Sequence, residues 1–158
     1  MGHAAPFAFD PAYAPAEGIE RMRVGTPPVI ALAALDAALD VWEGVDMAAL
    51  RARSVDLTQA FIDGVEAACP DVVLHSPRAP AQRGSQVGFR HPQAHAVMQA
   101  LIAEGVIGDF RAPDVLRFGF APLYNNMGDV TRAVETLAAI LRDRRWDRPE
   151  HHRRAAVT

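Results

Sequence analysis

The chain has 158 residues and a hydrophobic content of 50%, which suits one folded domain with a substantial core. A net charge of -3 and a pI near 6.0 give no reason to expect nucleic acid or an anionic membrane surface as a partner. No apolar run reaches the roughly 18 residues of a membrane-spanning helix, and the first basic residue, Arg21, comes too late for the positive start of a signal peptide. The single cysteine, Cys69, excludes an internal disulfide and suits a reducing compartment, so we expect a soluble cytoplasmic protein.

The basic residues of the chain are all arginine. Sixteen arginines account for the whole Lys+Arg total of 16, so the sequence contains no lysine. The chain therefore cannot form a Schiff base with a carbonyl cofactor or substrate through a lysine amine of its own. A GC-rich genome, which favours arginine codons, is an alternative explanation for the same composition.

The first 26 residues differ in composition from the rest. Pro6, Pro11 and Pro15 forbid a long helix, while three aromatic side chains in the same stretch are too apolar for a free tail. We expect residues 1–26 to form an extended loop segment that lies on a surface.

Two long helices are predicted next, over residues 27–44 and 46–69. Thr26 is a good N-cap for the first helix, with the two following prolines in its first turn, and Asp46 is a good N-cap for the second. Apolar residues recur with a helical period through both segments, and Pro70 ends the second.

Short strands and two more helices are predicted beyond Pro70. Their expected bounds are strands at 71–75 and 85–90, a helix from Pro92 to Gly105, strands at 106–110 and 115–120 around a turn at 112–114, and a helix from Met127 to about Arg144. This order predicts an α+β fold with a small, largely antiparallel sheet covered by helices on one side. We expect residues 27–145 to form this domain and residues 146–158 to form a polar, mobile tail.

One arginine lies inside an apolar strand. The period-2 rule sends Leu116, Phe118 and Phe120 to one face of the strand, and it sends Arg117 with Gly119 to the other. A guanidinium in this setting needs an anion, and its planar fork suits a carboxylate or a phosphate. Two interpretations are open: Arg117 binds a ligand, for which Gly119 leaves room, or it forms a structural ion pair with a carboxylate elsewhere in the fold.

Several long motifs resemble one family. The stretches GHAAPFAFDPAYAPAEGI, GTPPVIALAALDAALDVWEGVD, RGSQVGFRHP and GVIGDFRAPDVLRFGFAPLY, in this order, are similar to kynureninase. The resemblance implies a homodimeric fold-type-I enzyme that uses pyridoxal 5'-phosphate to hydrolyse L-kynurenine, or 3-hydroxykynurenine, to L-alanine and anthranilate or its hydroxy derivative in tryptophan catabolism. It covers only the C-terminal part of such an enzyme, because the large-domain half that carries the cofactor lysine has no counterpart here.

The resemblance also implies roles for individual residues. Arg117 matches the arginine that binds the α-carboxylate of the substrate, and Thr26 matches a residue that reaches the cofactor phosphate from the neighbouring subunit. Gly25 would line the same spot as Thr26, and His3 lies where the active-site wall is expected. The simpler alternatives are a structural ion pair for Arg117 and a helix cap for Thr26.

Other residues with reactive side chains give weaker evidence of a functional site. His91 and His95 stand four apart at a helix start, but the sequence places no third metal ligand beside them, so we expect no metal site. Cys69 is expected to be a small buried apolar residue.

The expected function is therefore that of a C-terminal kynureninase portion that supplies the carboxylate-binding arginine and a phosphate contact, and none of the catalytic residues. Alone, such a chain should be inactive because the Schiff-base lysine is absent. The alternative is a non-catalytic interaction module, or one half of a split enzyme whose large-domain half is a separate chain. A truncated or mis-started reading frame is a third possibility.

Overall fold

The computed structural model describes residues 2–23 and 25–153. By its internal contacts the chain divides into two compact units, Met1–Val45 and Asp46–Thr158. The boundary lies between the two long helices, and the domain division expected from the sequence stays a prediction.

In the first unit, the described N-terminal residues form an irregular loop closed by a short bridge between His3 and Pro15. The backbone N–H of Gly2 donates to the carbonyl of Arg21 at 2.6 Å, and a Cβ at Gly2 would collide with the backbone of Glu20. Only glycine therefore fits at this crossing. The loop continues into a single 3₁₀ turn, η1 (Gly18–Met22).

Helix α1 (Val29–Leu39) follows, extended by the 3₁₀ turn η2 (Asp40–Trp42). Its N-cap is Pro28, without a side-chain capping bond, so the prediction that Thr26 caps this helix is wrong. The reason is local: a cap at Thr26 requires Pro27 to be the first helical residue, and Pro27 is pushed out of the helical region because it precedes Pro28. No residue of α1 is buried, although most of its side chains are apolar.

The second unit begins with helix α2 (Met47–Ala68). The side chain of Asp46 accepts hydrogen bonds from the backbone N–H groups of Ala48 and Ala49, which confirms Asp46 as the N-cap. The helix ends at Cys69, directly before Pro70, as the sequence predicts.

A four-stranded sheet forms the centre of this unit, in the order β1-β2-β4-β3 with all neighbours antiparallel. The strands are β1 (Val73–Leu74), β2 (Gln86–Arg90), β3 (Asp109–Arg111) and β4 (Val115–Gly119). The 3₁₀ turn η3 (Pro80–Gln82) lies in the connection from β1 to β2, and helix α3 (Ala94–Ala103) lies between β2 and β3. Helix α4 (Met127–Arg142) and the turn η4 (Pro149–His152) complete the described chain.

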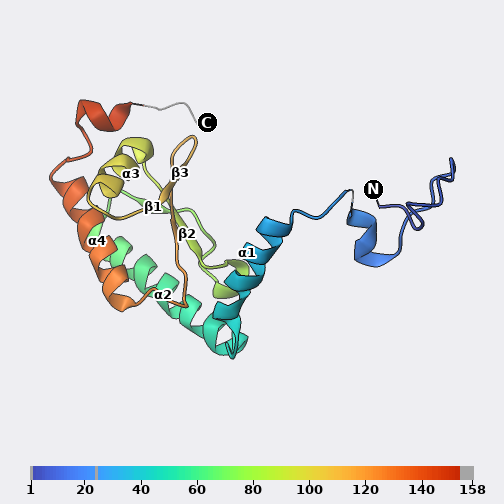
Figure 1. Ribbon diagram of the computed structural model, residues 1–158. Helices are drawn as coiled ribbons and strands as arrows, with labels where there is room; N and C mark the ends of the chain where they lie inside the picture. Colours follow the sequence, from blue (N-terminus) through green and yellow to red (C-terminus); the bar gives the residue numbers. More distant parts are fainter. Residues whose placement is uncertain (1, 24, 154–158) are drawn as a thin grey trace. The chain divides into compact units, whose positions relative to one another are not determined.

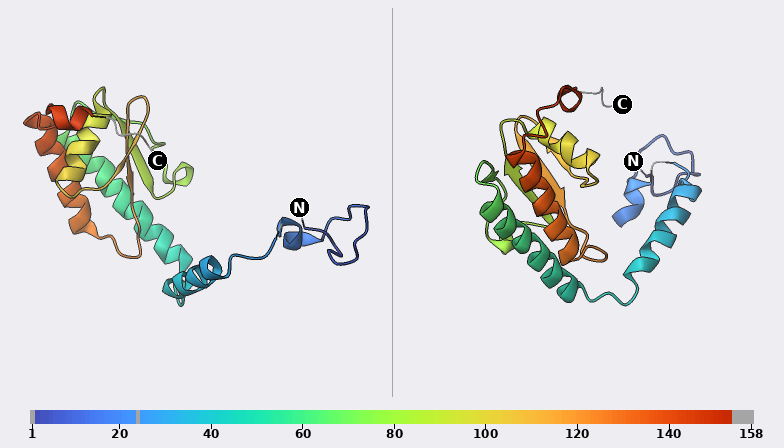
Figure 2. Two further views of the ribbon diagram at one scale, coloured as in Figure 1. Left: turned by 45° about the horizontal axis from the view of Figure 1, so that its top comes forward. Right: turned by 90° about the vertical axis from the view of Figure 1, so that its left-hand side faces the viewer.

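The three helices α2, α3 and α4 lie on the same side of the sheet (Figures 1 and 2). The core between the two layers contains a cluster of aromatic rings, in which Phe61 of α2 lies 4.8 Å from Phe118 and 5.9 Å from Phe89, measured between ring centroids. Phe120 packs on the same ring at 5.2 Å. The α+β class with a small antiparallel sheet covered on one side is confirmed.

All four strands are shorter than predicted, β2 and β4 by one residue each and β1 and β3 by more. β3 begins at Asp109 rather than at residue 106, because Gly105 adopts a positive φ of 82° and the N–H of Val106 still bonds to the carbonyl of Leu101 at the end of α3. Val106 therefore closes the helix, and the strand begins only after it. β1 is reduced to two residues, paired with Phe89 and Arg90.

The segment after α4 is not a free tail over the residues that the structure describes. Trp146 packs against the core cluster, and His151 is 9% exposed. This segment contacts α3. Its polar composition predicted a tail, although Trp146 and His151 anchor it to the domain. Residues 154–158, also part of the predicted tail, lie outside the described residues.

Among the described residues, no helix is both long enough and apolar enough to cross a membrane.

The aromatic cluster leads to a stability prediction. Phe61 is fully buried and contacts three other phenylalanine rings, so Phe61→Ala should lower the free energy of unfolding by about 3–5 kcal/mol through lost burial and a residual cavity. Urea denaturation followed by circular dichroism measures the change. The control is Ile107→Ala, since Ile107 is 84% exposed and its truncation should change the free energy by less than about 0.5 kcal/mol.

A buried histidine leads to a prediction on pH. The His91 ring is 8% exposed, its Nδ1 accepts from the N–H of Gln93 at 3.0 Å, and its edge meets Trp146. Burial lowers the pKa of His91 below the ordinary value of 6.5, and Asp71 offsets part of that effect. The unfolded chain therefore binds a proton at His91 more readily than the folded chain does.

Stability should accordingly fall as the pH drops through about 6.5, and the loss should level off below the pKa of the folded chain. His91→Gln should remove this contribution, so the free-energy difference between wild type and variant should shrink from pH 7.5 to pH 5.5 in urea titrations. His75→Gln, at an exposed position, is the matched control. A difference independent of pH would contradict the prediction.

Candidate functional site

Arg117 lies on the open face of the sheet, opposite the helices. Its neighbours Leu116 and Phe118 are 0% and 4% exposed and point into the core, whereas the Arg117 side chain is 31% exposed. The alternation predicted for this strand is therefore confirmed.

Asp109 is the ionic partner of Arg117. The two residues stand directly opposite each other on β3 and β4, and Arg117 Nη2 donates to Asp109 Oδ2. The ion pair considered from the sequence thus exists. It engages one nitrogen of the guanidinium only.

The other two nitrogens of Arg117 differ from each other. Nε is buried and has no hydrogen-bond partner, whereas Nη1 has no partner among the described residues and is not among the buried unpaired atoms. A ligand can therefore reach Arg117 through Nη1 and the remaining hydrogen of Nη2, which is the end of the fork that suits a carboxylate.

Gly119 is exposed beside Arg117 on this face of the sheet, whereas Gly88, the other glycine next to Arg117, is buried. A Cβ at Gly119 would have only Gln86 Cγ within reach, at 4.0 Å, so the surface there is open. Gly88 stands opposite Arg117 on β2, where a Cβ would approach Val115 Cγ1 at 3.2 Å. The space predicted beside Arg117 at Gly119 is present.

Thr26 and Gly25 lie in the first unit, before α1, and both are exposed. No hydrogen bond joins the Thr26 side chain to another described residue. The first intrahelical bond runs from the N–H of Leu32 to the carbonyl of Pro28, which leaves the N–H groups of Val29 and Ile30 free for an anion. The phosphate role of Thr26 and Gly25 stays a prediction, and these groups are compatible with it.

His3 is held by its own loop. Its Nε2 lies 3.1 Å from the carbonyl of Ala12, and its Nδ1 accepts from the N–H of Ala5 at 2.9 Å. Both ring nitrogens are therefore engaged, and the ring edge faces Tyr13. A contact from His3 to a substrate stays a prediction, and it would require this loop to release one nitrogen.

The remaining reactive side chains are not arranged as a metal site. His91 is engaged as described above, and the His95 ring packs on Phe110. Within residues 2–23 and 25–153, no three His, Cys, Asp or Glu side chains could hold a metal ion together. Cys69 is 2% exposed, and burial raises the pKa of its thiol to about 11, which makes it a poor nucleophile.

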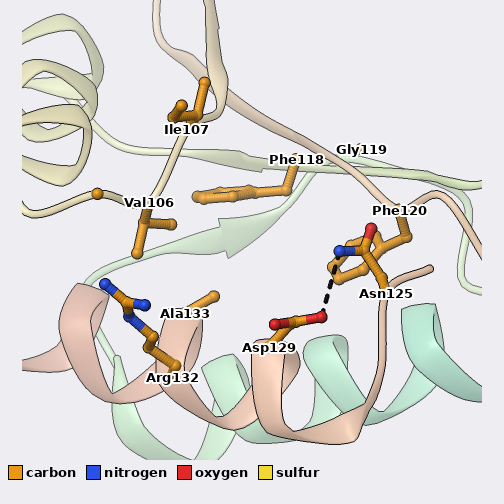
Figure 3. A pocket seen from close by; sticks show the side chains of 10 residues that line it. Val106, Ile107, Phe118, Gly119, Phe120, Asn125, Asp129, Arg132 and Ala133 are labelled. Carbon is orange, nitrogen blue, oxygen red and sulfur yellow. Dashed lines mark hydrogen bonds between the residues drawn. The ribbon is translucent and has the colours of Figure 1, made fainter.

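A cavity of about 190 Å³ opens on the helix-covered side of β4 (Figure 3). Phe118 and Phe120 form part of its wall, and Asn125, Asp129 and Arg132 contribute polar groups. Asp129 belongs to the capping box of α4, in which Asn126 is the N-cap. The cavity is lined by none of Arg117, Thr26, Gly25 and His3, although Gly119, next to the Arg117 side of β4, forms part of its wall.

Sequence reasoning did not identify Asp109 as the partner of Arg117. A signal was present, because counting outward from the predicted turn at 112–114 pairs Arg111 with Val115 and Asp109 with Arg117. Arg83 was also missed. It is 7% exposed and donates to the carbonyls of Pro77 and Arg78 and to Gln59, so it fastens the loop between β1 and β2.

Comparisons with known proteins place the chain in a family. The model of the kynureninase C-terminal domain matches residues 50–137. Kynureninases from Burkholderia mallei and Burkholderia pseudomallei are each 51% identical over 159 aligned residues, covering 99% of this chain and 38% of theirs. The kynureninase of Deinococcus radiodurans is 55% identical over 143 residues, covering 89% of this chain and 35% of its own. The chain thus spans little more than a third of the length of these relatives. It belongs to the kynureninase family, of which it carries the C-terminal portion.

Proposed function

We propose that this chain is the substrate-binding C-terminal part of a kynureninase that hydrolyses L-kynurenine, or its 3-hydroxy derivative, in tryptophan catabolism. The observation that carries the proposal is Arg117, a guanidinium on the open sheet face with Nη1 accessible and an open surface at Gly119. Arg117 binds the α-carboxylate of the amino acid through two parallel hydrogen bonds and so fixes the orientation of the bond to be cleaved.

The residues present fit one end of pyridoxal 5'-phosphate. The exposed hydroxyl of Thr26 and the free N–H groups at the start of α1 suit its phosphate, and Gly25 leaves the approach open. The chain has no lysine to hold the aldehyde of the cofactor, so that amine belongs to other polypeptide. When bound, the cofactor supplies an electron sink for carbon–carbon cleavage. This chain contributes binding and orientation.

The exposed apolar side chains of α1 support a partner. Val29, Ile30 and Leu35 are 71%, 88% and 54% exposed, and α1 has no basic residue and only one acidic residue, Asp36. Such a surface needs a cover. We propose that it is covered in a homodimeric cytoplasmic enzyme by a large domain, whether that domain lies on the same polypeptide or on a separate one. A pure interaction module without enzymatic function is the competing proposal, and the same helix supports it.

Activity assays separate these proposals. The purified 158-residue chain should release no anthranilate from L-kynurenine, since it lacks the lysine. A fused enzyme, in which this chain replaces the matching segment of the Burkholderia mallei kynureninase, should release anthranilate, detected by its fluorescence. Turnover by the chain alone would contradict the first expectation. A folded fused enzyme without activity would favour the interaction module.

The role of Arg117 is tested in the fused enzyme. Arg117→Gln should lower kcat/KM for L-kynurenine by about 100-fold, because two charge-assisted hydrogen bonds to the carboxylate are lost. Arg117→Lys should recover only part of this, since an ammonium lacks the planar fork. The matched control is Arg90→Gln, on the same face of the sheet but in β2 and paired with Asp114, which should change kcat/KM by less than about threefold. Equal losses in both variants would contradict the assignment.

A further inference from the structure

Arg117 belongs to an ionic triad on the open face of the sheet. Asp109 Oδ2 accepts from Arg117 Nη2 and lies 3.0 Å from Arg111 Nη2. We propose that Asp109 and Arg111 are positioning residues for Arg117, and that the triad selects a ligand with a single carboxylate. This inference rests on the proposed function of Arg117 and deepens it.

The hairpin of β3 and β4 places the triad. Arg111 pairs with Val115 and Asp109 pairs with Arg117 across the two strands. Asp109 and Arg111 are two residues apart on β3, so both side chains leave the same face as Arg117. Directly opposed residues on an antiparallel pair have their Cβ atoms about 5 Å apart, which lets a short aspartate reach the guanidinium across the strands.

The pairing with Asp109 decides which nitrogens remain for a ligand. Asp109 holds Nη2 from the side of the edge strand, while Nε is turned into the structure and buried without a partner. A long side chain such as arginine otherwise has many rotamers on an open surface. Held in this way, the guanidinium leaves Nη1 and the second hydrogen of Nη2 for an incoming carboxylate.

Arg111 determines the net charge of the triad. Asp109 alone would neutralise Arg117 and weaken its attraction for an anion. With Arg111 on the same oxygen, the triad has two guanidinium groups and one carboxylate, a net charge of +1. One carboxylate brings this charge to zero. A ligand with two negative charges leaves one of them uncompensated by the triad, and the charge of Arg90, on the neighbouring strand, is offset by Asp114 at 3.9 Å.

The fused enzyme tests the triad by separating KM from kcat. Asp109→Asn should raise KM for L-kynurenine about tenfold with kcat within about twofold, because the orientation of Arg117 is lost before the chemical step. Asp109→Glu keeps the carboxylate and should restore KM to within about threefold of wild type. If Asp109 acted through its charge alone, Asp109→Asn would lower KM, and that result would overturn the inference.

The dependence of KM on ionic strength distinguishes the positioning role of Asp109 from the charge role of Arg111. Arg111→Gln should raise KM about threefold at low ionic strength and less at high ionic strength, because it removes a screened charge. The rise in KM caused by Asp109→Asn should be no smaller at high ionic strength, because salt screens the attraction gained with the lost negative charge but does not restore the orienting bond. Arg90→Gln is again the control. An unchanged KM in Arg111→Gln at low salt would overturn the charge part of the proposal.

A measurement without substrate keeps the inference separate from the proposed function. In the 158-residue chain carrying isotope-labelled arginine, nuclear magnetic resonance should show a protected Arg117 Nε–H, identified by its loss in Arg117→Gln. Asp109→Asn should speed its exchange with solvent by at least about tenfold, while Arg90→Gln should leave it unchanged. If Asp109→Asn leaves the exchange rate unchanged, Asp109 does not position Arg117. If it speeds exchange but Arg117→Gln leaves kcat/KM intact, the proposed function fails and the positioning stands.

Discussion

The central place of β4 in the sheet is the constraint on which the rest of the second unit depends. β4 pairs with β2 on one edge and with β3 on the other, and Leu116 and Phe118 bury one of its faces beneath the helices. A shift of one residue would drive Arg117 into the phenylalanine cluster and expose the two apolar side chains. The cost of that exchange fixes the register. It therefore also fixes the face on which the arginine lies and the aspartate it meets.

Local patterns in the sequence predicted much of this. The alternation of apolar residues over 115–120 predicted that Arg117 lies on the face opposite Leu116 and Phe118. Asp46 and Pro70 predicted the two ends of α2. These features depend on a few neighbouring residues, so they can be read without the fold. The local pattern also indicated that Arg117 faces an anion, whereas its role toward the substrate carboxylate and the phosphate role of Thr26 came from the family resemblance alone.

Features that depend on contacts between distant residues escaped prediction. The partnership of Asp109 with Arg117 needs the hairpin register, and the late start of β3 needs the hydrogen bond that closes α3 at Val106. The burial of His151 needs the surface of α3. The cap predicted at Thr26 is wrong for a different reason: the side chain suits a cap, but Pro27 precedes Pro28 and so cannot be the first residue of the helix.

The exposure of α1 has a consequence for the life of the protein in a cell. An apolar helix without a cover is what chaperones bind and what proteases cleave once the surrounding chain opens. If the proposed cover of α1 lies on a separate polypeptide, copies that meet it would be shielded and surplus copies would be removed. The amount of this polypeptide that accumulates would then follow the supply of whatever covers α1, so that the two components stay in balance without dedicated control of their synthesis.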